Sequence, residues 1–297
     1  MRPKYHKLAG NGIGLYLTGM MNIGVFGLGI IGRVWAENLH RDGDTVRGWN
    51  RTAKPELPFY TSDARAAAAQ SDLLIIVVAD PPAVQQVLDQ ILPALRTGQI
   101  VVQSSTISPS ATLRFAAQVQ TTGAAFLEAP FTGSKPAAEQ RQMVFYIGGN
   151  PENLERARPV LSRLSRAIEF IGPLGSASAL KLALNMNLAL MAESLGESLT
   201  FARATGISDD RFFSALKLNV GQSGLATLKE PKLRTGDWSP QFSLKHMGKD
   251  LRLTIESAGQ QPLPQLRALV KLYETGLARG WGDDDFTGLT RLLTKPV

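Results

Sequence analysis

Two sets of residues in this sequence are spaced for chemistry. The first is a run in which glycines follow the pattern G-x-G-x-x-G: Gly27, Leu28, Gly29, Ile30, Ile31 and Gly32. In a strand-to-helix turn, the first glycine permits the tight turn, the second lets the backbone approach a pyrophosphate, and the third lets the helix lie close to the strand. The first turn of the helix offers free N–H groups to phosphates. We therefore expect a dinucleotide to bind this run.

The second set is a lysine and an amide on one predicted helix. Lys181 and Asn185 stand four residues apart, and this spacing puts them on the same helix face among leucines. A lysine in an apolar setting has a lowered pKa and can exchange a proton near neutrality. The alternative is an ordinary surface lysine beside a polar partner, and spacing alone does not decide between the two.

The residues that follow the strand expected at 45–49 indicate which dinucleotide binds. An NAD-binding chain usually has Asp or Glu about 20 residues beyond the glycines, whereas an arginine there suits a 2′-phosphate. This chain offers Asn50, Arg51 and Thr52, with no carboxylate. A solvated loop arginine is the alternative. We expect NADP(H), with Val78 and Ala79, at the end of the apolar run 72–79, as further contacts.

The elements that must position these residues change in character along the chain. Strands are expected at 45–49, 72–79, 100–102, 125–129 and 143–147, with helices between them and a short edge strand at 168–171. A hydroxyl cluster with Ser105 and Thr106 follows the strand 100–102, where it could serve a ligand or only cap the next helix. Beyond Gly175 only helical spacing remains, at 179–205, 209–218 and 263–279, and Ser176 or Ser178 could cap the first of these helices.

This pattern predicts an α/β Rossmann-type dinucleotide-binding domain followed by an all-α C-terminal domain. We expect residues 21–178 to form the NADP-binding domain and residues 179–297 to form a helical substrate and oligomerisation domain. Residues 1–20 are expected to be an N-terminal extension, because their apolar stretch is too short and interrupted for a signal peptide. An early start codon, with the true start at Met21, is the related alternative.

Composition narrows the functional classes. The 297 residues include no cysteine, which excludes disulfides and thiolate nucleophiles, and the three histidines are not at metal-ligand spacing. The net charge of +7 comes from scattered lysines and arginines that are not interleaved with aromatic residues, so we expect small anionic ligands and no nucleic acid. No run reaches transmembrane length. We expect a cytoplasmic protein with no metal and no membrane partner.

Several motifs in order along the chain carry a family likeness. They are Gly27–Gly32, Ser105-Thr106, Ala129-Pro130-Phe131-Thr132-Gly133, the element Gly172-x-x-Gly175-x-x-x-x-x-Lys181-x-x-x-Asn185, and the segment from Phe242 to Asp250. The chain resembles the β-hydroxyacid dehydrogenases over residues 21–293. Imine reductases share this architecture, but they have another residue at the position of the family's catalytic lysine. The presence of Lys181 therefore favours alcohol and aldehyde chemistry.

The resemblance implies roles for matching residues. Lys181 would be the general acid and base, with Asn185 as its hydrogen-bonding partner, and Thr106 and Lys249 would contact the cofactor near the nicotinamide. The residues that it implies around the substrate are Ser105, Thr132, Gly133, Ser134, Phe242 and Asp250. It also implies a homodimer or homotetramer.

Two positions depart from the family pattern. Thr132 stands where serine is common, and its extra methyl group narrows the substrate site at this point. Ser134 stands where many members have a second glycine. The segments 133–139 and 50–52 look most like the glyoxylate/succinic semialdehyde reductases.

The expected activity is therefore the NADPH-dependent interconversion of a small carboxylate-bearing aldehyde and its hydroxy acid. The alternatives are a 3-hydroxyisobutyrate or tartronate semialdehyde dehydrogenase that uses NAD, an NADP-binding protein without turnover, and a basic nucleic-acid binder.

Overall fold

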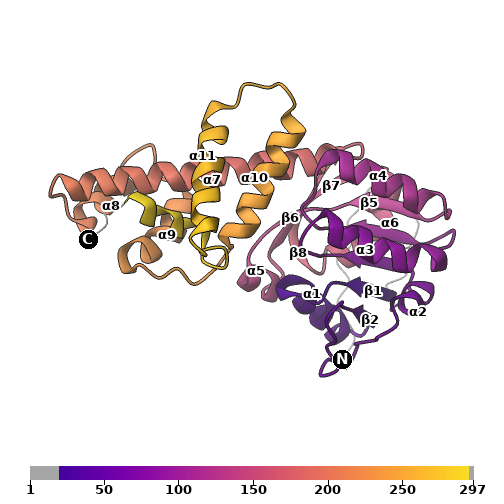
Figure 1. Ribbon diagram of the computed structural model, residues 1–297. Helices are drawn as coiled ribbons and strands as arrows, with labels where there is room; N and C mark the ends of the chain where they lie inside the picture. The colour runs from indigo at the N-terminus through magenta and orange to yellow at the C-terminus, as the bar shows by residue number, and fades with distance from the viewer. Residues whose placement is uncertain (1–19, 294–297) are drawn as a thin grey trace, which may run out of the picture.

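The computed structural model describes residues 20–293, which form a sheet-containing unit and a helical unit joined by one long helix, α7 (Ser176–Ala204) (Figure 1). The expected extension, residues 1–20, lies outside the described residues except for Met20. No helix within residues 20–293 is both long and apolar enough to cross a membrane.

The sheet has eight strands within the described residues, and its order is β2-β1-β3-β4-β5-β7-β6, with β8 paired to β7. Their bounds are β1 Asn22–Phe26, β2 Thr45–Trp49, β3 Leu73–Ile76, β4 Ile100–Gln103, β5 Ala125–Glu128, β6 Phe131–Thr132, β7 Met143–Gly149 and β8 Ser165–Gly172. The first five strands are mutually parallel, whereas β7 runs antiparallel to β5 and β6. The strand order reverses at β1, and ligands of such sheets bind outside the carboxyl ends of the strands at such a switch point.

Helices cover both faces of the sheet. Their bounds are α1 Ile30–Arg41, α2 Ala64–Ala69, α3 Pro81–Ile91 with the 3₁₀ turn η1 Leu92–Ala94, α4 Pro109–Gln120, α5 Lys135–Glu139 and α6 Pro151–Leu161. One core contains side chains of α1, α5 and α6, and the other contains side chains of α2, α3 and α4. Successive residues of β3 alternate between them: Leu74 lies in one core and Ile75 in the other. Burial on both faces explains why this strand reads as a continuous apolar run.

The helical unit is built around the second half of α7. Its further elements are α8 Asp209–Lys217, α9 Gly224–Thr235, α10 Leu244–Ala258, α11 Pro264–Ala278 and the 3₁₀ segment η2 Phe286–Leu293. Its core includes Met247 and Leu251 of α10, Tyr273 of α11 and Phe286 of η2. In Figure 1, α10 and α11 cross α7 between its two ends, so that α10 lies beside the sheet-containing unit.

The predicted class, a Rossmann-type domain followed by a helical one, is confirmed, whereas several local predictions were wrong. The strand expected at 72–79 ends at Ile76, where the chain leaves the sheet toward Val78. The short edge strand expected at 168–171 is the eight-residue β8, parallel to β7. The short β6 and α5 were not predicted. The N-cap of α7 is Gly175, in the left-handed region at φ +96°, and neither Ser176 nor Ser178 occupies that position.

One buried ion pair holds three segments of the helical unit together. The Lys229 ammonium of α9 lies 2.8 Å from each Asp285 carboxylate oxygen, and both side chains are almost fully buried. Asp285 also accepts hydrogen bonds from the backbone N–H of Gln241 and from the N–H and hydroxyl of Thr287. The pair therefore fixes the loop before α10 as well as the start of η2.

Loss of the lysine would leave that carboxylate buried and uncompensated. Lys229→Ala should lower the free energy of unfolding by about 3–5 kcal/mol, the usual cost of breaking a buried pair from one side. The measurement is urea denaturation at neutral pH. The matched control is Lys217→Ala, which breaks the ion pair of the exposed Lys217 with Glu230 and should cost about 1 kcal/mol or less. Equal effects of the two changes would contradict the assigned role.

Candidate active site

The glycine turn lies at the carboxyl end of β1, next to the switch point. A Cβ at Gly27, which has φ +106°, would lie 2.2 Å from the Val77 carbonyl oxygen, and a Cβ at Gly32 would lie 2.0 Å from the Gly27 carbonyl oxygen. These two glycines are therefore required by packing. A Cβ at Gly29 would meet nothing within 4 Å. The backbone at Gly29 thus borders open space at the start of α1, and this arrangement fits the pyrophosphate of a dinucleotide. Leu28 of this turn is buried, whereas Ile30 is exposed.

The end of β2 is tied to this turn. The Asn50 side chain accepts a hydrogen bond from the Leu28 N–H at 2.9 Å and donates one to the Thr52 carbonyl at 2.8 Å. The neighbouring Arg51 is exposed, and its guanidinium donates to Gln86 of α3 at 3.4 Å. Within residues 20–293, Arg51 has no carboxylate partner. Asn50 therefore has a structural role at the turn, and Arg51 is the basic group beside it.

Ser105 links the ends of β3 and β4. Its buried hydroxyl accepts from the Val78 N–H at 2.8 Å, and its own N–H donates to the Gln103 side chain. The Ser105 hydroxyl is thus engaged with the backbone of the segment that follows β3, and no hydrogen bond joins it to Lys181. Ala79, the next residue after Val78, is exposed at this edge.

Lys181 lies at the centre of a polar cluster that α7 carries into the space between the units. Its side chain is on a helix of 29 residues, and the residue is 8% exposed. The ammonium donates to Asn185 Oδ1 at 2.9 Å and lies 3.5 Å from Thr132 Oγ1 of β6. The Asn185 amide in turn donates to Asp250 of α10 at 2.6 Å. The ammonium is therefore held from its own helix and from the sheet, while Asp250 orients its amide partner.

The cluster continues to the sheet through Lys249. The Lys249 ammonium lies 2.9 Å from Asp250 Oδ1 and donates to the Thr106 backbone carbonyl at 2.7 Å. Thr106 and Lys249, both predicted to contact the cofactor, thus meet through the main chain of the loop after β4. This contact joins α10 of the helical unit to the sheet.

Burial changes the acid strength of Lys181. It lowers the pKa of the Lys181 ammonium from 10.5 to about 8, because removal of water disfavours the charged form. The negative charge of Asp250 acts in the opposite direction, and the positive charge of Lys249 adds to the lowering. A group with this pKa exchanges a proton readily near neutral pH.

The other predicted substrate residues form no hydrogen bond with Lys181. Gly133, at φ +140°, has no room for a side chain beside Met143, and the exposed Ser134 forms the N-cap of α5. Phe242 stacks on His246 with ring centroids 6.3 Å apart and meets Phe286 edge-on. No hydrogen bond joins Gly133, Ser134 or Phe242 to Lys181.

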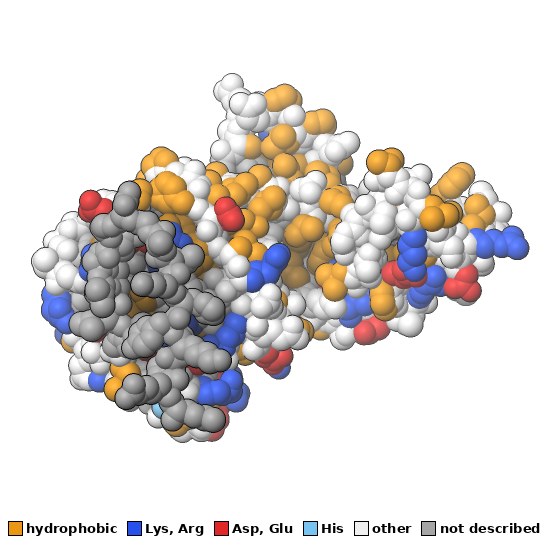
Figure 2. Space-filling view, turned by 180° about the vertical axis from the view of Figure 1, so that it is seen from behind, with side chains coloured by type: hydrophobic (Ala, Val, Ile, Leu, Met, Phe, Trp, Pro, Cys, Tyr) orange, Lys and Arg blue, Asp and Glu red, His pale blue; other side chains and the backbone are white. Residues whose placement is uncertain are grey.

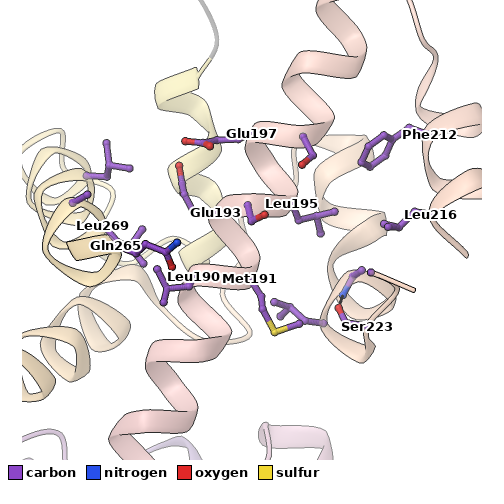
Figure 3. Close-up of a pocket in the computed structure, with 17 residues that line it drawn as sticks. Leu190, Met191, Glu193, Leu195, Glu197, Phe212, Leu216, Ser223, Gln265 and Leu269 are labelled. Atoms are coloured by element: carbon purple, nitrogen blue, oxygen red, sulfur yellow. Dashed lines mark hydrogen bonds between the residues drawn. The ribbon is translucent and has the colours of Figure 1, made fainter. Parts of the chain in front are cut away.

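A separate groove of about 760 Å³ lies on the helical unit, away from Lys181. Figure 3 shows Leu190, Glu193 and Glu197 of α7 between Phe212 of α8 and Gln265 of α11. Burial, and to a smaller extent the charge of Glu197, raises the pKa of Glu193 to about 7. This acidic pair was not predicted from the sequence, although its spacing of four residues on α7 marks one helix face.

Comparison with known proteins agrees with the fold. Residues 22–172 match the NAD binding domain of 6-phosphogluconate dehydrogenase, and residues 175–293 match the NAD-binding of NADP-dependent 3-hydroxyisobutyrate dehydrogenase. The chain is 30% identical over 285 residues to 2-hydroxy-3-oxopropionate reductase of Escherichia coli, covering 92% of this chain and 97% of that protein. It is 29% identical over 286 residues to the chloroplastic glyoxylate/succinic semialdehyde reductase 2 of Arabidopsis thaliana, covering 93% and 80%.

A solved structure shows the same architecture. The 3-hydroxyisobutyrate dehydrogenase of Mycobacterium tuberculosis with L-serine superimposes with a TM-score of 0.86 at 26% identity, covering 93% of this chain and all of that one. The chain belongs to the β-hydroxyacid dehydrogenase family, whose members are NAD(P)-dependent oxidoreductases that act on CH–OH groups.

The lowered pKa of Lys181 predicts the pH dependence of turnover. As the proton donor of an aldehyde reduction, Lys181 would have to be protonated, so kcat for reduction should be high below pH 7 and should fall as the pH rises through about 8. As the proton acceptor in alcohol oxidation it would have to be neutral, so the oxidation rate should rise over the same interval. Steady-state rates from pH 6 to 10 in both directions check the prediction. A reductive rate that stays constant to pH 10 would contradict it.

Proposed function

We propose that this protein is an NADPH-dependent reductase that interconverts a small carboxylate-bearing aldehyde, glyoxylate or a semialdehyde, and its hydroxy acid. The observation that carries the proposal is the buried Lys181 ammonium, hydrogen-bonded to Asn185 and 3.5 Å from Thr132, between the sheet and the helical unit. A proton donor at this place suits a carbonyl group that becomes an alcohol.

The chemistry follows from the charge that develops during reduction. The bound nicotinamide dinucleotide supplies the hydride. Lys181 donates its proton to the carbonyl oxygen as negative charge grows there, and such general acid catalysis contributes about 10²–10⁴-fold. In oxidation the neutral amine accepts the hydroxyl proton. Asn185 keeps the amine oriented, because its oxygen accepts from Lys181 while Asp250 fixes its amide.

A carboxylate on the substrate would bind the segment Thr132-Gly133-Ser134. Gly133 and Ser134 are exposed, and the Thr132 hydroxyl lies beside Lys181, so an anion held here brings its aldehyde group toward the ammonium. The E. coli and Arabidopsis relatives, which are named for oxo-acid and semialdehyde substrates, support this substrate class. An NAD-dependent 3-hydroxyisobutyrate or tartronate semialdehyde dehydrogenase is the alternative within the family.

The preference for NADPH would come from Arg51. This arginine follows β2 next to Asn50, which is bonded to the glycine turn, and it has no carboxylate partner in residues 20–293. A guanidinium in that place pairs well with a 2′-phosphate.

The helical unit would also serve self-association. Its exposed apolar side chains include Phe201, Ile207, Leu218, Val220 and Leu228. Figure 2 shows apolar side chains gathered on this part of the molecule, as expected of a surface that meets another protein. We expect a homodimer or homotetramer and no nucleic-acid partner. Light scattering coupled to gel filtration checks the assembly, and a mass that stays at 32.1 kDa on dilution and on concentration would contradict it.

The role of Lys181 is tested by two substitutions. Lys181→Ala should lower kcat by about 10²-fold or more, while NADPH affinity stays near that of the wild type, because the glycine turn and Arg51 are untouched. Lys181→Arg should fail almost as badly, since a guanidinium keeps its proton. The measurements are reduction kinetics at saturating aldehyde and NADPH titration. Lys245→Ala, an exposed lysine on α10, is the control; an alanine variant at position 181 within threefold of wild-type kcat would remove Lys181 from the mechanism.

The coenzyme preference is tested at Arg51. Arg51→Asp should abolish or reverse the preference for NADPH, because a carboxylate repels a 2′-phosphate and accepts from ribose hydroxyls. The ratio of kcat/KM for NADPH to that for NADH is the measurement. Arg211→Asp makes the same change at an exposed position of α8 and should leave this ratio of kcat/KM values unchanged. A wild-type enzyme that prefers NADH would overturn the assignment.

A further inference from the structure

A buried carboxylate at the end of β5 holds the helix that carries Lys181. Glu128 is the last residue of β5 and is fully buried. Its Oε1 accepts from the N–H groups of Gly175 at 2.7 Å and Ala177 at 2.9 Å, and its Oε2 accepts from the N–H of Ser178 at 3.1 Å and from the Ser178 hydroxyl. These N–H groups belong to the first turn of α7, where no intrahelical acceptor exists. A carboxylate there also complements the positive end of the helix dipole.

This cap differs from the local side-chain caps of six other helices. Helices α2, α3, α4, α6, α8 and α9 are each capped by the side chain of the residue just before them. The N-cap of α7 is Gly175, which has no side chain, and the acceptor comes from a strand 47 residues earlier. The start of α7 is therefore fixed by the sheet and not by its own sequence.

Two further features of the sheet-containing unit fit this carboxylate. The Ser178 hydroxyl donates its proton to Glu128, so Thr112 of α4, whose hydroxyl oxygen lies 2.8 Å away, donates to Ser178. On the paired strand β7, Gly148 lies opposite Glu128, and a Cβ there would come within 2.0 Å of Glu128 Oε1. The surroundings thus leave room for the carboxylate and complete its hydrogen bonds.

The position of Glu128 connects the two walls of the site. Four residues after it the chain reaches Thr132, and three residues after its last contact, Ser178, the helix reaches Lys181. Thr132 Oγ1 and Lys181 Nζ face each other at 3.5 Å. One carboxylate therefore sets the relation between the strand-borne hydroxyl and the helix-borne amine.

We propose that Glu128 is a positioning residue of the reaction, because it holds the first turn of α7 on β5. In this way it fixes the distance between the Lys181 amine and Thr132, and it keeps the Lys181 amine shielded from water. The inference rests on the proposed function, in which Lys181 is the proton donor. Glu128 acts through α7 and contacts neither substrate nor cofactor.

A less firmly held first turn of α7 would change the pKa of Lys181, which can be measured. The charged groups that face the Lys181 amine are Asp250 and Lys249 of α10, while Asn185 and Thr132 are neutral. Burial is the largest cause of its lowered pKa. Entry of water would therefore raise the pKa of Lys181 from about 8 toward 10.5.

The test replaces Glu128 by glutamine, which keeps the size but turns an NH₂ group toward donors. Glu128→Gln should lower kcat for aldehyde reduction by about tenfold or more and leave the Kd for NADPH within about threefold, with the fall of kcat moved to higher pH. Glu128→Asp, which keeps the charge with a shorter reach, should give an intermediate kcat. Asp63→Asn makes the same chemical change at the N-cap of α2 and should leave kcat unchanged.

A second readout needs no turnover. The rate at which a small amine-reactive reagent labels Lys181, followed by peptide mass spectrometry from pH 6 to 11, reports the pKa of the amine directly. The midpoint in Glu128→Gln should be higher than in the wild type by about half a pH unit or more. If the wild type reduces no aldehyde but the midpoint moves, the proposed function fails and the positioning role stands.

Three results would overturn the positioning role. The first is kcat within twofold of the wild type with Lys181 labelling unchanged, in a protein whose Lys181→Ala variant is inactive. The second is a fall in kcat with equal loss of NADPH affinity or with no change in labelling, which would indicate general damage. If Glu128→Gln does not fold, the test uses Ser178→Ala instead, which removes one of the four hydrogen-bond donors to Glu128. The third contradicting result is then a Ser178→Ala variant in which neither kcat nor the labelling of Lys181 changes.

Discussion

The Lys181 ammonium is almost completely enclosed by protein, and a charged amine in that setting must be held by partners. Asn185 and Thr132 hold it directly, and Asp250 holds Asn185. These residues come from a helix, a strand of the sheet and a second helix, so the amine can exist in this state only when both units are in place. The same burial that makes the amine costly gives it a pKa near 8, at which it can act as an acid and as a base.

The fold satisfies this requirement through α7. The helix begins on the sheet, where Glu128 accepts hydrogen bonds from its free N–H groups, and its far half contributes side chains to the core of the helical unit. Lys249 closes the arrangement by joining α10 to the loop after β4 through the Thr106 carbonyl. The glycine turn and Arg51 lie on the same sheet, at its switch point. The proposed dinucleotide site and the proposed proton donor are therefore carried by one scaffold whose parts are fixed to each other by a few buried polar contacts.

Local patterns in the sequence predicted much of this arrangement. The glycine spacing predicted the turn after β1, the continuous apolar run predicted the central strand β3, and the spacing of four residues predicted that Lys181 and Asn185 share a face. What remained hidden depends on contacts between distant segments. Asp250 reaches Asn185 across 65 residues, and Thr106 meets Lys249 through its backbone carbonyl, which no side-chain pattern reveals. Glu128 caps α7 across 47 residues, whereas local reasoning placed that role on Ser176 or Ser178. β8 was predicted too short because its exposed residues interrupt the apolar pattern.

The central claim is that the protein reduces aldehydes bearing a carboxylate, and substrate selectivity of the wild-type enzyme tests it most directly. The measurement is kcat/KM with NADPH for glyoxylate and succinic semialdehyde, compared with butanal, in which a methyl group replaces the carboxylate of succinic semialdehyde. An anion-binding segment beside Lys181 predicts that at least one of the two acids exceeds butanal by about 10²-fold, since unpaired polar groups in a site reject an analogue that lacks their partner. Equal turnover of butanal, or no turnover of either acid with NADPH or NADH, would contradict the account.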